Sequence, residues 1–106
     1  MDRDAAADVG DEHTAPPAPG STIRPDPNVL AKRVGDEIVL VHLETNRVFE
    51  LNRTAAFLWD ALGAGATRDV LEERMALEFD VERDALAREI DDLLSQFASE
   101  RLTRAE

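Results

Sequence analysis

Cysteine is absent from the 106 residues, so the chain can form neither a disulfide nor a thiolate metal site and offers no cysteine nucleophile. The longest apolar runs, such as residues 38–41, fall far short of the roughly 20 residues that span a bilayer. The N-terminal stretch MDRDAAADVGDEH lacks the basic and then apolar pattern of a signal peptide. These absences predict a cytoplasmic protein with no membrane association.

Basic residues are scarce, since 12 Lys and Arg stand against 23 Asp and Glu and the formal net charge is -11. Such a charge repels a phosphate backbone and an anionic membrane alike, so neither is expected as a partner. Aromatic residues make up only 5% of the chain, and a chain of this length has room for one small core. The large side chains available to that core are Phe49, Phe57, Trp59, Phe79 and Phe97.

Proline is missing after residue 27, and all five prolines precede that point among scattered Asp, Ala and Gly. The same stretch shows no apolar periodicity, which is typical of a segment that cannot bury enough surface to fold. We therefore predict a disordered acidic tail over residues 1–28 and a folded domain over residues 29–104.

Three short runs rich in β-branched residues open the predicted domain. They are VLAKRV (residues 29–34), EIVLVHL (37–43) and RVFEL (47–51), and turn residues such as Gly35 and Asp36 separate them. This pattern predicts a three-stranded antiparallel meander.

Three helices are predicted after the strands. Asn52 is a good N-cap for a helix over residues 53–62, and Thr67 caps the next one. A third helix, over about residues 82–99, would be capped by Asp80. Three strands followed by three helices make the fold class α+β, with helices on one side of a small sheet. The order resembles a winged helix.

The third helix has an apolar face that is wider than one packing seam requires. Its predicted core stripe is Leu86, Ile90, Leu93 and Phe97. Beside the stripe, on one flank only, lie Arg83, Ala87, Asp91 and Leu94. The widened face suits either the wall of a groove or simply a broader core, and periodicity alone favours neither.

Residues that could carry chemistry are few. His13 and His42 are isolated, and no spacing in the sequence assembles a metal site. His42 is interpreted as a surface or sheet residue. The acidic pairs at Glu72-Glu73 and Asp91-Asp92 are typical of solvated helix faces. We therefore expect no enzymatic activity, no catalytic residues, no metal and no cofactor.

A DNA-binding winged-helix regulator is the alternative that the element order permits. The third helix would then enter the groove of the DNA, yet residues 82–100 carry six acidic residues and only two basic ones, Arg83 and Arg88. A helix that reads DNA needs the opposite balance. A third possibility is a domain that binds a folded protein through its helices.

The backbone of the third strand offers another kind of binding. If residues 47–51 form the free edge of the sheet, their unpaired N–H and C=O groups are a template for another extended chain. The run RVFEL contains no proline to blunt such an edge. Strand addition of a peptide would use this edge. Because the edge could also pair with its copy, we expect a monomer or a weak dimer.

Residues 29–104 resemble the PqqD family, which is named for pyrroloquinoline quinone biosynthesis. The resemblance rests on LETNRVFELNRTAAFLWDALGAGATRDVLEERMALEFDV, followed by a long helix. Its most specific part is an aromatic-x-Leu-Asn string that ends in tryptophan and is followed by a threonine after a glycine-containing loop. The matching residues are Phe49, Leu51, Asn52, Ala55, Ala56, Leu58, Trp59 and Thr67.

The resemblance implies a RiPP recognition element, which is a non-catalytic domain that binds the leader of a ribosomally made precursor peptide. It implies a partner that modifies the precursor, such as a radical SAM enzyme or a leader peptidase. In the family the leader adds as a strand beside the third strand and lies against the third helix. The implied ladder is Arg47, Val48, Phe49, Glu50 and Leu51, and we expect the flank of Arg83, Ala87, Asp91 and Leu94 to wall the groove.

Overall fold

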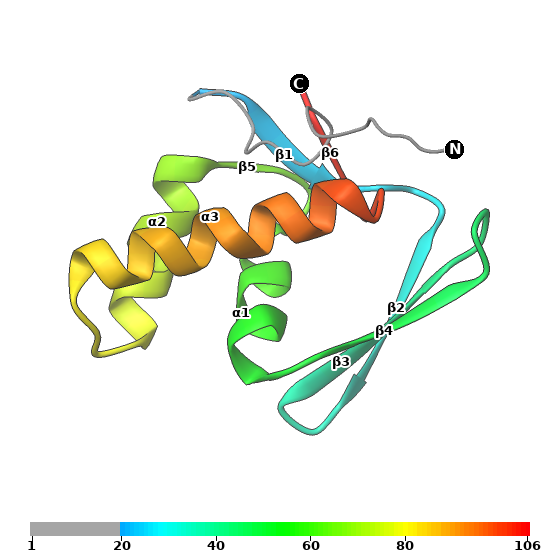
Figure 1. Cartoon of the computed structure of the whole chain (residues 1–106), viewed down its shortest axis with the longest axis horizontal. Helices are drawn as coiled ribbons and strands as arrows, with labels where there is room; N and C mark the ends of the chain where they lie inside the picture. Colours follow the sequence, from blue (N-terminus) through cyan, green and yellow to red (C-terminus); the bar gives the residue numbers. More distant parts are fainter. Residues whose placement is uncertain (1–19) are drawn as a thin grey trace, which may run out of the picture.

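The computed structural model describes residues 20–106, and residues 1–19 of the predicted tail lie outside the described part. Two antiparallel sheets and three helices make an α+β fold, as predicted (Figure 1). The elements are β1 (Thr22–Pro25), β2 (Val29–Val34), β3 (Glu37–His42), β4 (Arg47–Leu51), α1 (Arg53–Leu62), β5 (Ala66–Thr67), α2 (Arg68–Glu78), α3 (Arg83–Ser99) and β6 (Thr103–Ala105). One sheet has the order β2-β3-β4 and the other β5-β1-β6, so the likeness to a winged helix is loose.

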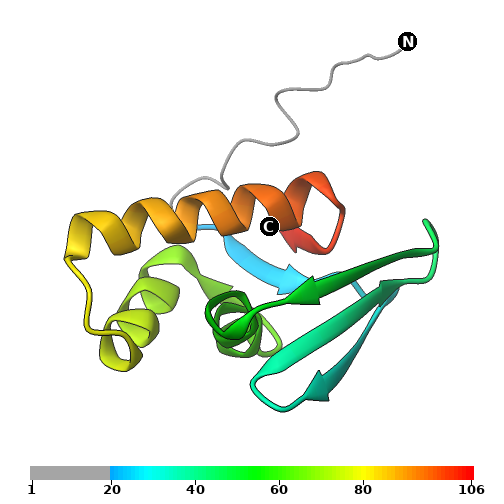
Figure 2. The same ribbon diagram turned by 60° about the horizontal axis from the view of Figure 1, so that its bottom comes forward.

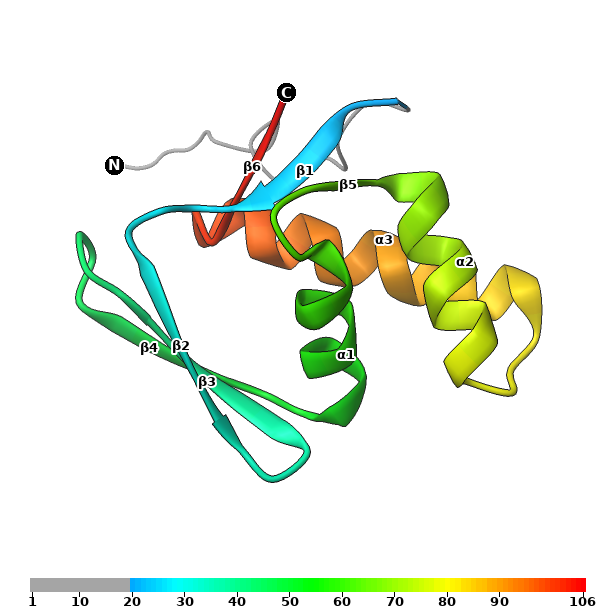
Figure 3. The same cartoon turned by 180° about the vertical axis from the view of Figure 1, so that it is seen from behind.

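The sheet β2-β3-β4 is the predicted meander. Gly35, at φ +65°, lies in the two-residue turn between β2 and β3, where a side chain would be strained. The register places Leu40 opposite Phe49 and Ile38 opposite Leu51, so these four residues share one face. That face packs toward the helices, and α1 stands beside it with α2 on the far side of α1 (Figure 3).

The first two helices begin at the predicted caps. Asn52 Oδ1 accepts a hydrogen bond from Ala55 N–H at 3.0 Å, and Thr67 Oγ1 accepts one from Val70 N–H at 3.4 Å. Each cap satisfies an N–H group that has no carbonyl partner within its own helix. The bounds of α1 are those predicted, since it ends before Gly63.

The third helix begins later than its predicted cap. Leu86 N–H donates to Glu82 O at 2.9 Å in the first helical turn, and Glu82 itself is extended at φ −62° and ψ 142°. A capping side chain must belong to the residue at this boundary. Asp80 lies two residues too early, so the prediction that it caps α3 is wrong. No side chain caps this end.

A second sheet, which the sequence did not predict, brings the two ends of the described chain together. The central strand β1 pairs with β5 and β6, and its buried Ile23 lies opposite both Ala66 and Ala105. Because residues 22–25 belong to the fold, the predicted tail extends too far and the predicted boundary before residue 29 comes too late. A four-residue strand that ends in proline gives no alternation long enough to detect.

The core is formed by side chains from both sheets and all three helices. Trp59 of α1 meets Phe97 of α3 edge to face, with ring centroids 5.7 Å apart and planes at 87°. In α3, Leu94 is buried and Leu93 is only half-buried. The prediction was the reverse, with Leu93 in the core stripe and Leu94 on its flank. Among the described residues, no helix is both long and apolar enough to cross a membrane.

His42 joins the meander to the segment after α3. Its side chain is buried, with 0% exposed. Nε2–H donates to the Arg101 carbonyl oxygen at 3.1 Å, and Nδ1 accepts from Glu44 N–H at 3.2 Å. Since a carbonyl only accepts and an N–H only donates, these two contacts select the tautomer with its proton on Nε2. His42, which was interpreted from the sequence as a surface or sheet residue, is therefore a buried sheet residue that connects β3 to the segment after α3.

Asp26 fastens the end of β1 to β6. Its buried carboxylate accepts a hydrogen bond from Asn28 N–H at 2.8 Å and another from Arg104 Nε at 3.0 Å. Burial alone would raise the pKa of Asp26, but these hydrogen bonds and the positive charge of Arg104 hold the pKa below its ordinary value. The charged form therefore stabilises the folded state.

We expect Asp26→Asn to lower the free energy of unfolding at about pH 7 by roughly 1–2 kcal/mol, because a charge-assisted hydrogen bond is lost. The lowered pKa means that the contribution is present above the ordinary carboxyl pKa of about 4 and is lost as the pH falls through the folded-state pKa. When the pH is lowered from about 7 to about 3, the free energy of unfolding measured with urea should therefore fall less in the variant than in the parent. Asp36→Asn, in an exposed turn, should change neither quantity. An Asp26→Asn variant as stable as the parent at the higher pH would contradict this account.

Candidate functional site

Strand β4 is an edge strand, as predicted. It pairs with β3 on one side, and no strand within residues 20–106 pairs with its other side. Figure 2 shows β4 as the strand of the meander nearest α3, running below the end of that helix. The free edge of β4 therefore faces α3, and side chains of both elements lie in the space between them.

The direction of the backbone groups in β3 follows from two hydrogen bonds. Leu43 N–H donates to Asn28 O at 2.8 Å, so the backbone groups of residue 43 point toward the β2 side. Backbone direction alternates along an antiparallel strand, so the even-numbered residues of β3 point toward β4. Asn46 N–H donates to His42 O at 2.8 Å, which agrees with this direction.

Alternate residues of β4 consequently face the open edge. The even-numbered residues of β3 pair with Arg47, Phe49 and Leu51, whose backbone groups are used within the sheet. Val48 and Glu50 lie between them and present their N–H and C=O groups outward. Two residues of the predicted ladder of five thus offer hydrogen bonds, and the other three hold the strand in place.

A hollow of about 430 Å³, which we call the β4 groove, lies between this edge and the end of α3. It is lined by residues 47–51, Gln96, Phe97, Ser99, Glu100 and Leu102. Phe97 and Leu102 are buried core residues, so the base of the groove is apolar. Its rim on α3 is polar. An apolar base beside unpaired backbone groups is suited to an extended peptide.

An ion pair crosses the β4 groove from strand to helix. The Arg47 guanidinium contacts the Glu100 carboxylate at 2.7 Å. The same guanidinium lies over the Phe49 ring, 5.2 Å from its centroid, in a cation–π contact. Arg47 therefore covers an aromatic side chain that would otherwise face the groove.

Three of the four residues predicted to wall the groove on α3 contact α2 instead. Arg68 of α2 donates to the Asp91 carboxylate at 2.7 Å and to the Ala87 carbonyl at 3.1 Å. Arg83 pairs with Glu72 of α2 at 3.0 Å. The structure thus brings the predicted ladder residues together at one edge and places the predicted helical wall elsewhere.

These contacts form a charged network that holds α2 against α3. The hydrogen bond to Asp91, with further help from Glu72, raises the pKa of Arg68. Hydrogen bonds from Arg68 and then Arg83 lower the pKa of Glu72. Both shifts favour the charged forms. None of these residues lines the β4 groove.

The fourth predicted residue, Leu94, belongs to the core with only 1% of its surface exposed. At about 100° per residue, Leu94 lies roughly 160° around the helix from Gln96, which does line the groove. The groove wall was predicted on the flank of α3 where additional apolar residues widen the apolar face of the helix. The side of α3 toward β4 is polar instead, with Gln96 and Glu100, so an apolar pattern had no signal for it.

His42 is the histidine of the described part of the chain, and both its ring nitrogens are engaged by backbone groups. Within residues 20–106, no three His, Cys, Asp or Glu side chains lie close enough together to hold a metal ion. The expected lack of enzymatic activity stays a prediction.

Comparisons with known proteins identify a family and a similar structure. The model of the PqqD family, described as coenzyme PQQ synthesis protein D, matches residues 37–102. A solved structure of TbiB1 in complex with the TbiA(beta) leader peptide is similar, with a TM-score of 0.72 and 26% sequence identity. The similarity covers 76% of this chain and 94% of that one. No curated protein sequence matches significantly.

We expect Leu94→Ala to lower the free energy of unfolding by about 2–4 kcal/mol, because it leaves a cavity in the core. Gln96→Ala, two residues away on the groove side, should change it by less than about 0.5 kcal/mol. Chemical denaturation of both variants measures the difference. Equal effects would show that the two sides of α3 are not divided between core and groove.

Proposed function

Because this chain belongs to the PqqD family, whose model matches more than half of it, we propose that it binds the leader segment of a ribosomally synthesised precursor peptide. The observation that carries the proposal is the open edge of β4, where Val48 and Glu50 direct into the β4 groove backbone groups that no strand of residues 20–106 pairs with. The likeness to TbiB1, solved with a leader peptide, supports leader binding as the function.

The leader would add as a fourth strand to the sheet β2-β3-β4. Its backbone would exchange hydrogen bonds with Val48 and Glu50, which gives affinity without reading sequence. Its alternate side chains would point to the base of the groove at Phe97 and Leu102, which gives selection for apolar residues at every second position. The wall on α3 would be Gln96 and Glu100 in place of the flank predicted from the sequence.

The chain would act as a peptide chaperone and carry out no chemistry itself. By holding the leader, it would present the rest of the precursor to a maturation enzyme, such as a radical SAM enzyme or a leader peptidase, in the cytoplasm. Peptide addition would also occupy the edge through which two copies could pair, so a weak dimer would dissociate on binding.

Within residues 20–106, no structural feature favours the alternative of a DNA-binding regulator. The exposed positions of α3 include Asp84, Glu89 and Asp92, and these would repel a phosphate backbone. The helix that would enter a DNA groove is instead packed along its length against α2 and the core.

The first test replaces an outward-facing donor of β4. Val48→Pro removes the N–H that would bond the leader while leaving the bonds to β3, so we expect peptide binding to weaken about tenfold or more. The measurement is an NMR titration of labelled protein with a synthetic peptide that has the leader sequence of a precursor encoded beside the gene. In the parent, the shifts should concentrate at Val48 and Glu50.

The matched control lies on the other edge of the same sheet. By the same alternation, Ala31 of β2 directs its N–H away from β3, so Ala31→Pro should keep the fold and the peptide affinity. Should Val48→Pro fail to fold, N-methylation of successive peptide residues gives a second measurement, and strand addition predicts loss of binding at every other position. A folded Val48→Pro protein that binds as tightly as the parent would show that no strand adds at β4.

The ion pair across the groove gives a second prediction. Glu100→Gln frees Arg47 from its place over Phe49, and an exposed pair contributes roughly 0.2–1 kcal/mol, so we expect leader affinity to rise by up to about fivefold. Glu44→Gln is the control, because Glu44 pairs with Arg101 at 3.0 Å between neighbouring segments and does not line the groove. Isothermal titration calorimetry measures both. Equal affinities of the two variants would mean that the pair does not compete with the peptide.

A further inference from the structure

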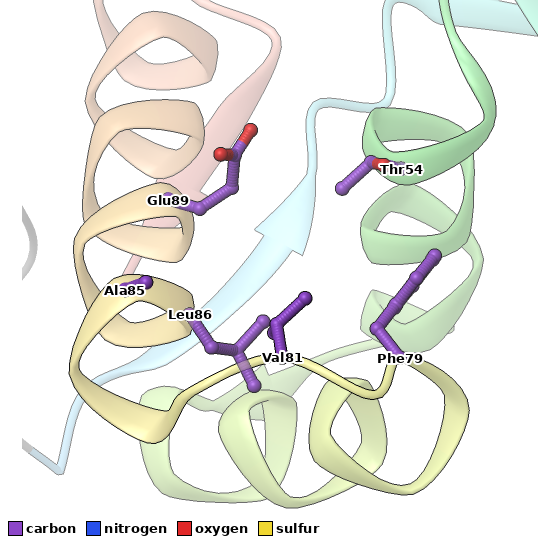
Figure 4. Close-up of a pocket in the computed structure, with 6 residues that line it drawn as sticks. All are labelled: Thr54, Phe79, Val81, Ala85, Leu86 and Glu89. Carbon is purple, nitrogen blue, oxygen red and sulfur yellow. The ribbon is translucent and has the colours of Figure 1, made fainter.

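A second hollow, of about 170 Å³, lies where α1, the loop after α2 and α3 meet. Its lining residues are Thr54, Phe79, Val81, Ala85, Leu86 and Glu89. Figure 4 shows Phe79, Val81 and Leu86 gathered at one end, with Thr54 and Glu89 toward the other end on α1 and α3. We call this hollow the anchor pocket. It has an apolar base and two polar groups at its side.

The anchor pocket has lining residues that lie close along the chain to those of the β4 groove in two segments. In one segment, Leu51 of the groove is followed three residues later by Thr54 of the pocket. In the other, Gln96 of the groove and Glu89 of the pocket are two turns apart on α3, or roughly 10 Å at 1.5 Å per residue. An extended peptide covers this distance with about three residues.

The apolar side of the pocket is already in place in the free chain. Phe79 meets Phe57 edge to face, with ring centroids 5.4 Å apart and planes at 83°. The Arg53 guanidinium lies 4.9 Å from the centroid of the Phe79 ring and pairs with Glu78 at 3.0 Å. Held from both sides, Phe79 needs no rearrangement to receive a ligand, which lowers the cost of binding.

Val81 leaves an apolar surface uncovered at this pocket. Its side chain is 53% exposed, although neighbouring Leu86 is only 3% exposed. A side chain seated against Phe79 and Leu86 would also cover Val81 and so remove more apolar surface from water. The volume suits one such group, since an apolar cavity of roughly 150 Å³ can hold a benzene molecule.

We propose that the anchor pocket binds one branched aliphatic or phenyl side chain of the leader peptide. This residue would lie about three to five positions beyond the leader residue that pairs with Glu50. The Glu89 carboxylate would repel an acidic side chain there, so aspartate and glutamate are excluded. The inference rests on the proposed function and adds a specificity site outside the hydrogen-bonded ladder.

The test fills the pocket without touching the core. Ala85 is an exposed position that lines the pocket, so Ala85→Phe should occupy the site and weaken binding of the leader peptide about tenfold, the loss expected for one unburied apolar side chain. Ala64→Phe, at an exposed position in the loop after α1, is the matched control and should bind as the parent does. Calorimetry gives the affinities, and NMR of labelled protein follows the Val48 and Glu50 amides and the Val81 and Leu86 methyl groups.

The result that supports the anchor pocket is loss of the Val81 and Leu86 shifts in Ala85→Phe while the Val48 and Glu50 shifts persist. A peptide shortened at the end beyond Glu50 should give the same pattern with the parent protein. If the leader shifts Val48 and Glu50 only, and Ala85→Phe binds as tightly as Ala64→Phe, the anchor pocket is overturned and leader binding stands. If folded protein shows no shift at Val48 and Glu50 with the full leader, both proposals fail together.

Discussion

The β4 groove depends on the contact that holds the segment after α3 to the end of β3, because this contact keeps the end of α3 beside β4. His42 supplies that contact, since its buried ring donates to the Arg101 carbonyl and accepts from Glu44 N–H. A ring that donates from one nitrogen and accepts at the other holds both segments in place. The next residue in the sequence, Leu102, is buried and forms part of the base of the groove.

Neighbouring residues of β4 differ in what their backbone groups face, because the backbone direction alternates along an antiparallel strand. The backbone groups of Arg47, Phe49 and Leu51 bond to β3, while those of Val48 and Glu50 point to the open edge. The same alternation points the side chains of the latter two residues away from the helices, where Val48 is 61% exposed. In the proposed complex, selection among peptides would therefore come from the groove base, from its rim and from the anchor pocket.

Local patterns were enough to predict the meander and α1. The β-branched runs mark the strands, and Asn52 and Gly63 mark the ends of α1, through interactions with residues close in sequence. The family resemblance placed the ladder at residues 47–51, and the structure leaves that edge open. The sequence could not show that β1 exists, since its pairing partners lie more than 40 residues away along the chain. Nor did the sequence indicate that Gln96 and Glu100 line the groove, because polar residues carry no apolar signal.

The central place of β1 in its sheet has a consequence for the order of events during synthesis. Thr22 exchanges both backbone hydrogen bonds with Glu106, so β1 stays half-paired until the last strand emerges from the ribosome. Contacts so distant in sequence form late, after the local hairpins and helices. Leu102 of the groove base and the Arg101 carbonyl that holds His42 arrive with that same segment. A nascent chain would thus display the edge of β4 before it has a groove, and competence to retain a peptide would come only at the end of folding.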